Sequence, residues 1–271
     1  MNKLENMMLS HLLKLKNHNI SAVKISFEDE WLTGELAQII TSISMRAGVD
    51  VAIKIGGCEA RRDLHDAKVL GAAKVVAPMI ETPYSLKKFV EAVNIIYPIQ
   101  EWHDTNFVIN IETMTGFKNL IEMMNQEESK VISWITLWRV DFSWSIWKDR
   151  TYCNSDEMLE IAKNICEICR SNNKNFCLGW AISDKAIDFM RSLPLDVFST
   201  FETRNIVFDA KKVLEDEKLD DALITAMEFE LAWMQRKHEF YDRIANAEIS
   251  RIEMITQRVE SAKSALLSEN K

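Results

Sequence analysis

Short runs rich in valine and isoleucine alternate with amphipathic helical segments, and this alternation limits the fold more than any other feature. Seven such runs are predicted strands: residues 21–27, 49–55, 72–80, 106–113, 130–142, 175–180 and 196–203. Because the runs are apolar on both faces and are separated by helices, they favour a parallel sheet covered by helices. A closed barrel needs eight strands, so either the first is degenerate or one more strand goes undetected.

From about residue 205 the strand pattern ends, and residues 220–267 carry apolar side chains at helical spacing with many charges between them. We therefore predict an α/β fold, a TIM (β/α)8-type barrel in residues 1–208, with a C-terminal helical extension in residues 209–271. The extension is expected to pack on the barrel or on a neighbouring subunit.

Charge and hydropathy disfavour two classes of partner. The 271 residues carry 33 Lys and Arg against 41 Asp and Glu, a formal net charge of −8. Nucleic acid and membranes are therefore not expected as partners, and no apolar stretch reaches the roughly 18 residues that span a bilayer. The N-terminal segment "MNKLENMMLSHLLKLKNH" predicts a charged amphipathic helix rather than a signal peptide. We expect a cytoplasmic protein.

The five cysteines are expected to be reduced thiols. Cys166 and Cys169 form a C-x-x-C motif, but both fall on the apolar side of a helical segment. A zinc site would need a second ligand pair at suitable spacing. Core packing is the expected role of these two thiols.

Polar residues gather at the predicted strand ends, where ligands bind in parallel α/β folds. They are Glu28, Asp29, Glu30, Lys54, Gly56, Gly57, Glu81, Glu112, Thr113, Arg139, Asp141, Glu202 and Arg204. Carboxylates converging from several strands are the hard oxygen ligands that Mg²⁺ or Mn²⁺ prefers. Alternatively, these charges only pair with one another and with solvent. That alternative is weaker for Glu112 and Asp141, because both follow apolar strands where an unused charge is costly.

Five segments carry motifs of a known family. They are "KISFEDE", "AIKIGGCEARRDLHDAKVLGAAKVVAPMIETPYSLKKF", "NIETMTGFKNL", "RVDF" and "FETRNIVF". Over residues 20–208 the chain resembles the HpcH/HpaI aldolase and citrate-lyase β-like group, which belongs to the phosphoenolpyruvate/pyruvate barrel superfamily. The motifs "KIGGCEA…DL" and "APMIETPY" are the most specific part of the resemblance.

The resemblance implies a barrel that binds Mg²⁺ or Mn²⁺ through Glu112 of "NIET" and Asp141 of "RVDF". The ion would hold a pyruvate-like 2-oxo acid or an acyl-thioester enolate and stabilise the enolate as a Lewis acid. We therefore expect a class II, metal-dependent carbon–carbon lyase or aldolase acting on a 2-oxo acid and an aldehyde, possibly related to sugar acids. A citryl- or malyl-thioester lyase is an alternative.

The remaining strand-end residues receive roles from the same reasoning. The catalytic candidates are Glu28, Lys54, Arg139, Glu202 and Arg204. The substrate-binding candidates are Lys54, Gly56, Gly57, Glu81, Thr113 and Trp138.

Three departures from the family pattern point to another possibility. Lys54 stands where most of these aldolases have arginine, and the family's catalytic histidine near the first strand is absent. Proton transfer would therefore need Glu28, Glu202 or a metal-bound water. Trp138 and Trp144 occupy positions that the family gives to glycine and small residues, with Trp147 next. Such a barrel could be a binding or assembly subunit whose mouth is filled by indoles, or the indoles could form a stacking platform for a sugar.

The resemblance also implies a homo-oligomer, a trimer or hexamer. Phe229, Leu231 and Trp233 suit a contact between the helical extension and a neighbour, but they could equally cover the chain's own barrel.

Overall fold

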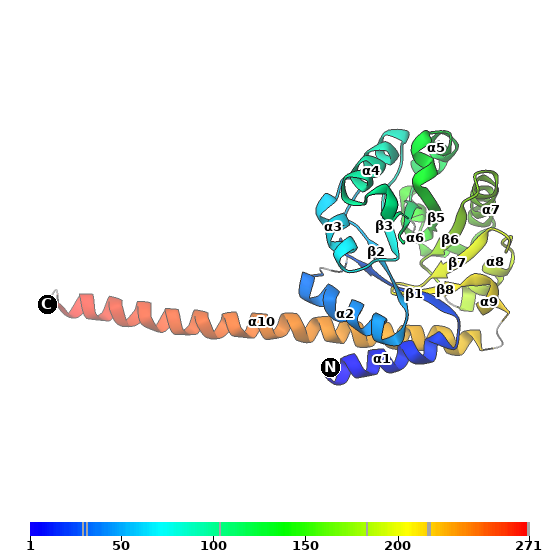
Figure 1. Cartoon of the computed structure of the whole chain (residues 1–271). Coiled ribbons are helices and arrows are strands. Elements are labelled where there is room, and N and C mark those ends of the chain that lie inside the picture. Colours follow the sequence, from blue (N-terminus) through cyan, green and yellow to red (C-terminus); the bar gives the residue numbers. More distant parts are fainter. Residues whose placement is uncertain (29, 31, 103, 183, 216–217, 270–271) are drawn as a thin grey trace.

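The structure is a computed structural model that describes residues 1–28, 30, 32–102, 104–182, 184–215 and 218–269. Eight strands close into a barrel in chain order, with helices around it (Figure 1). The strands are β1 (Ile20–Ser26), β2 (Asp50–Lys54), β3 (Lys74–Ala77), β4 (Asn106–Ile111), β5 (Ile132–Trp138), β6 (Asn175–Gly179), β7 (Phe198–Glu202) and β8 (Ile206–Asp209). The predicted α/β barrel of the TIM type is confirmed. Asp29, proposed at the end of the first strand, lies outside the described residues.

The eighth strand was not predicted, and its direction is unusual for this fold. Strands β1 to β7 pair in parallel, whereas β8 pairs antiparallel with both β7 and β1. Residues 203–205 join β7 to β8 as a tight hairpin, so no crossover helix separates them. A four-residue strand directly after a hairpin carries little periodic signal, which explains why only seven strands were predicted. The first strand is not degenerate, because β1 has seven residues.

Several of the helices around the barrel begin at a side chain that caps their N-terminus. The helices around the barrel are α2 (Gly34–Ala47), α3 (Arg61–Val69), α4 (Pro83–Ile96), α5 (Met114–Met124), α6 (Arg139–Ser145), α7 (Asp156–Ser171), α8 (Ile187–Arg191) and α9 (Ala210–Leu214), with 3-10 turns at Ile99–Glu101, Glu127–Val131, Arg150–Asn154 and Asp184–Ala186. The side chains of Thr33, Thr82, Thr113 and Ser155 accept the N-cap hydrogen bonds of α2, α4, α5 and α7. Cys166 and Cys169 are fully buried on α7, as predicted, and burial raises the pKa of the Cys166 thiol to about 12.

The predicted fifth strand is shorter than expected. The apolar run extends to residue 142, but β5 ends at Trp138 and α6 begins at Arg139. Asp141 therefore lies in the first turn of a helix rather than in a strand. A short run that is apolar on both faces fits either a strand or a buried helix, so periodicity alone could not locate this boundary.

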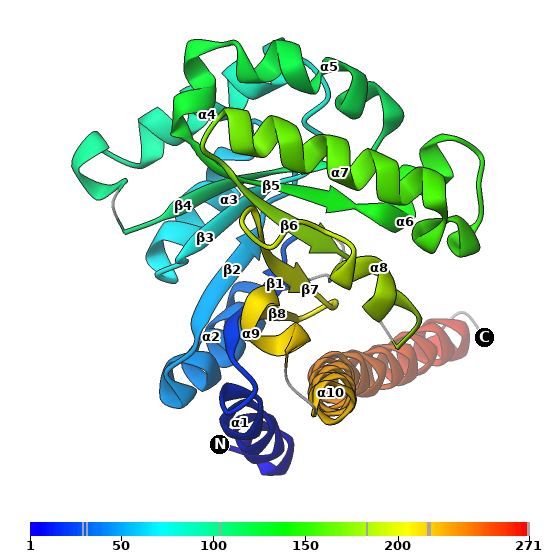
Figure 2. The ribbon, with the colours of Figure 1, turned by 90° about the vertical axis from the view of Figure 1, so that its right-hand side faces the viewer.

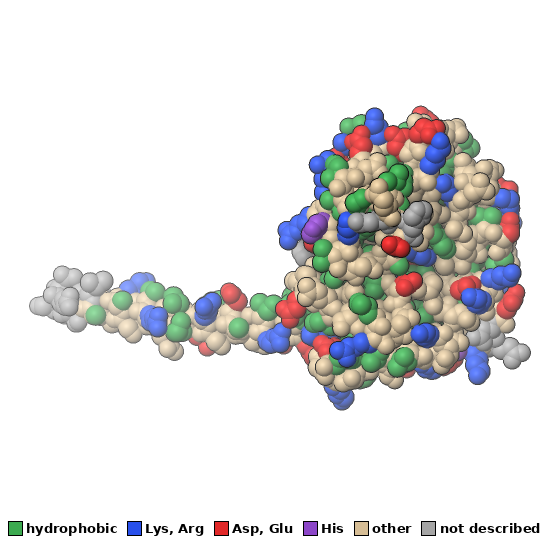
Figure 3. All heavy atoms as spheres, in the orientation of Figure 1, with side chains coloured by type: hydrophobic (Ala, Val, Ile, Leu, Met, Phe, Trp, Pro, Cys, Tyr) green, Lys and Arg blue, Asp and Glu red, His purple; other side chains and the backbone are tan. Residues whose placement is uncertain are grey.

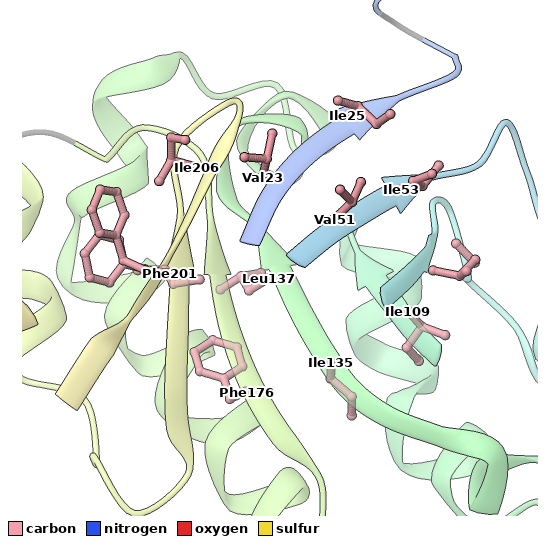
Figure 4. Packing of buried hydrophobic residues seen from close by; sticks show 14 of the residues in the cluster. Val23, Ile25, Val51, Ile53, Ile109, Ile135, Leu137, Phe176, Phe201 and Ile206 are labelled. Carbon is pink, nitrogen blue, oxygen red and sulfur yellow. The ribbon is translucent and has the colours of Figure 1, made fainter. Parts of the chain in front are cut away.

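The main hydrophobic core lies between the strands and the helices rather than inside the barrel. Val23, Val51, Ile53 and Ile135 belong to this core (Figure 4). Side chains alternate along a strand, so neighbours of these residues point into the barrel. The inward set is unusually polar, since Lys24, Lys54, Asn110, Thr136, Thr200 and Glu202 are all buried.

The C-terminal extension is the 51-residue helix α10 (Leu219–Glu269), which packs beside α1 (Lys3–Lys16) (Figure 2). Phe229 and Trp233 are fully buried within the chain, whereas Leu231 is 57% exposed. Two of the three residues proposed for a neighbour contact thus cover the chain's own barrel. Beyond Tyr241 the helix projects away from the barrel with apolar and charged side chains interspersed (Figures 1 and 3). Among the described helices, none is both long and apolar enough to cross a membrane.

Candidate active site at the barrel mouth

An indole occupies the centre of the barrel mouth. Trp138 is the last residue of β5 and is 6% exposed. The Nζ atom of Lys24, on β1, lies 3.8 Å from the Trp138 ring centroid, and the Nζ atom of Lys54, on β2, lies 5.7 Å from it. Since β1 and β5 stand on opposite sides of the eight-stranded ring, the indole spans the barrel lumen. Both amines are placed for cation–π attraction to it.

Gly179 provides the space that this indole needs. Trp138 and Gly179 are register partners on β5 and β6. A Cβ atom added at Gly179 would lie 2.2 Å from Cε3 of Trp138. The large residue on one strand therefore depends on the absence of a side chain on the next.

Replacing Gly179 by alanine is expected to lower the free energy of unfolding by about 2 kcal/mol, because the buried indole must shift in a packed lumen. Gly57→Ala is the matched control, since a Cβ atom there meets nothing within 4 Å. Urea denaturation of both variants measures the difference. Equal losses would contradict the close packing of Trp138 on Gly179.

Arg139 is fully buried and connects two loops behind the mouth. Its Nη1 donates to Cys153 O (3.0 Å) and Asn154 Oδ1 (2.6 Å), and its Nη2 donates to Trp180 O (2.6 Å) and Ala181 O (3.1 Å). Burial lowers the pKa of this guanidinium to about 10. These contacts favour a structural role for Arg139 over the predicted catalytic one.

The loop that Arg139 holds has a strained backbone. Trp180 and Ala181 have φ values of 56° and 52°, in the left-handed region that residues other than glycine seldom adopt. The Trp180 ring packs on Trp138, with centroids 5.5 Å apart, and Trp144 meets Trp180 edge to face. The three indoles thus form a continuous aromatic wall beside the mouth.

Glu202 is paired inside the barrel. Its carboxylate accepts a hydrogen bond from Lys24, and both groups are buried. Because this carboxylate is already paired with Lys24 inside the barrel, its contacts favour a structural role over the predicted role as a proton carrier. Lys24 was missed from sequence, although a lysine within an otherwise apolar strand was a usable signal.

The two proposed metal ligands and Lys54 come together at the mouth. Glu112 follows β4, is buried, and accepts hydrogen bonds from Asn110 Nδ2 (2.8 Å) and the Met79 backbone N–H (3.1 Å). Burial raises the pKa of Glu112; the charge of Asp141 adds to this rise, while Asn110, Lys54 and Met79 oppose it. Glu112, Asp141 and Lys54 are therefore close enough to interact electrostatically. Lys54 Nζ also lies 2.9 Å from Glu28 Oε2, and that carboxylate is 48% exposed.

This donor set fits a divalent cation. Each Glu112 oxygen accepts one protein hydrogen bond and keeps a second lone pair. A cation would relieve the repulsion between Glu112 and Asp141, and Asn110 Oδ1 is a buried acceptor without a hydrogen-bond donor in the described part of the chain. Within those residues no group of three or more His, Cys, Asp or Glu could hold a metal, so binding would depend on two carboxylates plus water or substrate oxygens.

Other predicted site residues have partners within the protein. Thr113 Oγ1 donates to Glu81 Oε1 (2.5 Å) and caps α5, which orients the start of that helix. The Gly56 N–H donates to Asp63 Oδ2 (2.7 Å), and Gly57 faces open space. Substrate binding by these residues stays a prediction.

Two hollows adjoin the aromatic wall. The inner one, bounded by Lys24, Lys54, Trp138, Trp180 and Arg204, has a volume of about 10 Å³. That is close to the smallest space that holds one water molecule. The outer one, of about 650 Å³, lies between the ends of β6 and β7 and the first turns of α10. A small substrate could therefore reach the inner hollow only if an indole rotates.

Solved structures with the same fold include several enzymes. The chain superposes on the citrate synthase SbnG with a TM-score of 0.57 and 15% identity, covering 84% of this chain and 98% of that one. An HpcH/HpaI aldolase from Desulfitobacterium hafniense DCB-2 gives a TM-score of 0.56 and 11% identity over 71% of this chain and 81% of that one. An HpcH/HpaI aldolase/citrate lyase family protein from Burkholderia cenocepacia J2315 gives 0.55 and 10% over 68% and 79%. Identities this low show the fold alone.

The sequence comparisons are more specific. A search of curated proteins gave no match. The model of the family described as HpcH/HpaI aldolase/citrate lyase matches residues 36–186, which is more than half of the chain. This match confirms the resemblance carried by the strand-end motifs: the chain belongs to the HpcH/HpaI aldolase/citrate lyase family.

Proposed function

We propose that the chain is a carbon–carbon lyase of the aldolase type, which uses Mg²⁺ or Mn²⁺ held by Glu112 and Asp141 and acts on a 2-oxo acid. The observation that carries this proposal is that Glu112, directly after β4, interacts electrostatically with Asp141, in the first turn of α6, and with Lys54, at the end of β2. Placing two carboxylates close together in a buried site lowers the stability of the fold unless a ligand or ion compensates their charge, so such pairs are common at functional sites. Family membership supports the reaction class.

The contacts of the residues at the mouth assign each of them a role in this reaction. A bound divalent ion would supply Lewis-acid stabilisation of an enolate. Asn110 and the Met79 N–H hold the Glu112 carboxylate in one orientation. Lys54 provides a point charge for the carboxylate of the oxo acid, without the bidentate fork of an arginine. When that carboxylate displaces Glu28 from Lys54, the half-exposed Glu28 becomes available to accept or deliver a proton.

A second function is favoured by the indole in the mouth. Trp138 lies between two lysines and leaves an inner hollow of about 10 Å³. A barrel filled in this way could serve as a binding or assembly subunit without turnover. The two functions differ in whether the indoles move to admit a substrate.

Turnover with metal distinguishes the two functions. We expect pyruvate release from at least some 4-hydroxy-2-oxo acids in the presence of Mg²⁺ or Mn²⁺, and loss of release on adding EDTA. A coupled lactate dehydrogenase assay over a panel of such acids, followed by a panel of acyl thioesters, measures this. A folded protein that is inactive across both panels would favour the binding subunit.

A further inference from the structure

The outer pocket of about 650 Å³ is built jointly by the barrel and by α10. Trp180 and Ile182 follow β6, Thr203 and Arg204 follow β7, and Leu223 and Met227 line it from one face of the helix. It opens at the carboxyl ends of the strands, where ligands bind in barrels of this type. Its volume is typical of a small-molecule site.

The wall of this pocket is largely apolar, and two of the apolar side chains that α10 contributes to it are exposed to solvent. Ile224 and Met227 are 51% and 59% exposed, and they sit beside Leu223 on the same helical face. Trp180 is half-buried, with its ring packed on Trp138 on the mouth side. Exposed apolar side chains gathered around a concave surface indicate a ligand with an apolar body.

The backbone that carries Trp180 is held in a costly conformation. The consecutive left-handed residues Trp180 and Ala181 are fixed by two hydrogen bonds from buried Arg139. A strained backbone of this kind persists only where surrounding contacts hold it in place, and such positions are common at ligand-binding sites. Here it places one indole in the wall that separates the inner hollow from the outer pocket, because Trp180 lines both.

Two cationic and two anionic side chains line the pocket: Arg150, Arg204, Asp220 and Glu230. Arg204 interacts electrostatically with Glu230. Arg150 and Asp220 are both exposed and line the same pocket, and within the described residues neither has an ion-pair partner within 4 Å. One cation and one anion thus remain for a ligand that carries both charges.

We infer that the outer pocket binds a free amino acid with a large apolar side chain. The side chain would lie against Trp180, Ile224 and Met227, the carboxylate would face Arg150, and the ammonium group would face Asp220. Charge-assisted hydrogen bonds to both ends would fix the orientation. Such binding requires no lyase turnover, so the amino-acid site can be tested independently of the function proposed for the barrel mouth.

Calorimetric titration of the full chain with L-phenylalanine tests this site. The matched probes are 3-phenylpropionate, which lacks the ammonium group, and 2-phenylethylamine, which lacks the carboxylate. We expect L-phenylalanine to bind more tightly than either probe. Absence of L-phenylalanine binding, or affinities equal to those of the two probes, would overturn the assignment.

Variants locate the binding and separate its two ends. Arg150→Gln should weaken the binding of L-phenylalanine and 3-phenylpropionate about tenfold and leave that of 2-phenylethylamine unchanged. Asp220→Asn should weaken the binding of 2-phenylethylamine about tenfold and leave that of 3-phenylpropionate unchanged. Met227→Asp should weaken all three ligands, whereas Met234→Asp, at a similarly exposed position of α10 outside the pocket, should not. All four positions are exposed, so these variants are expected to fold. Unchanged affinities in Arg150→Gln, Asp220→Asn and Met227→Asp would overturn the site.

Discussion

Replacing Arg139 by methionine is expected to lower the free energy of unfolding by about 4 kcal/mol. The guanidinium supplies donors to Cys153 O, Asn154 Oδ1, Trp180 O and Ala181 O, and it is fully buried. Methionine has a side chain of similar length but leaves these four acceptors without the donors that Arg139 supplies. The strained Trp180–Ala181 backbone would also lose the contacts that hold it. Equilibrium urea unfolding measures the change.

Arg170→Met is the matched control for this prediction. Arg170 lies on α7 and binds Asp196 and Glu167 at the surface. Partly exposed ion pairs contribute little, so a loss under about 1 kcal/mol is expected. If Arg139→Met lowered the free energy of unfolding no more than Arg170→Met, the four hydrogen bonds of the Arg139 guanidinium would not support the fold as described.

Glu112→Gln and Asp141→Asn are each expected to reduce metal-dependent turnover about a thousandfold. Both changes keep the size of the side chain and remove a charged ligand. Because the two residues act on one ion, the double variant should be little worse than either single one. Glu122→Gln, on the exposed face of α5, is the control and should keep normal activity. Steady-state kinetics with saturating Mn²⁺ measures these effects, and additive losses would argue against a shared ion.

The raised pKa of Glu112 gives this reaction a pH dependence. Metal binding needs the ionised carboxylate, and burial holds its pKa above the ordinary value of 4.5. Activity should therefore fall at a higher pH than an ordinary glutamate would give, as the pH drops through the raised pKa. Between that pKa and 4.5 the folded protein binds a proton that the unfolded chain does not, so in the metal-free protein this group weakens folding as the pH rises through the same range.

The main elements of the fold could be predicted from the sequence because the signals are local. Valine- and isoleucine-rich runs between amphipathic helices predict a barrel, and the positions of Glu112 and Asp141 after neighbouring apolar runs predict that the two carboxylates interact. The direction of β8 could not be predicted in this way, because it depends on a hairpin closing the ring between β7 and β1. The end of β5 was wrong by several residues, since the helix that follows is equally apolar.

Long-range contacts decide the roles of the polar residues, and for that reason these roles are harder to predict from the sequence than the strands and helices. Arg139 is the first residue of the "RVDF" motif, but its side chain binds backbone carbonyls of two other loops. Glu202 is paired with Lys24, which is 178 residues distant in sequence. The tryptophan at 138 was recognised as a departure, but its partner Gly179 could be assigned only from the register of β5 and β6. Periodicity carries no information about such contacts.

The central claim is that Glu112 and Asp141 hold a divalent ion at the barrel mouth. Titration of the metal-free protein with Mn²⁺, followed by electron paramagnetic resonance of the free ion, tests it most directly. Saturable binding to the wild type that is lost in both Glu112→Gln and Asp141→Asn, and kept in Glu122→Gln, is the predicted result. Mn²⁺ binding that is unchanged in Glu112→Gln and Asp141→Asn would contradict it.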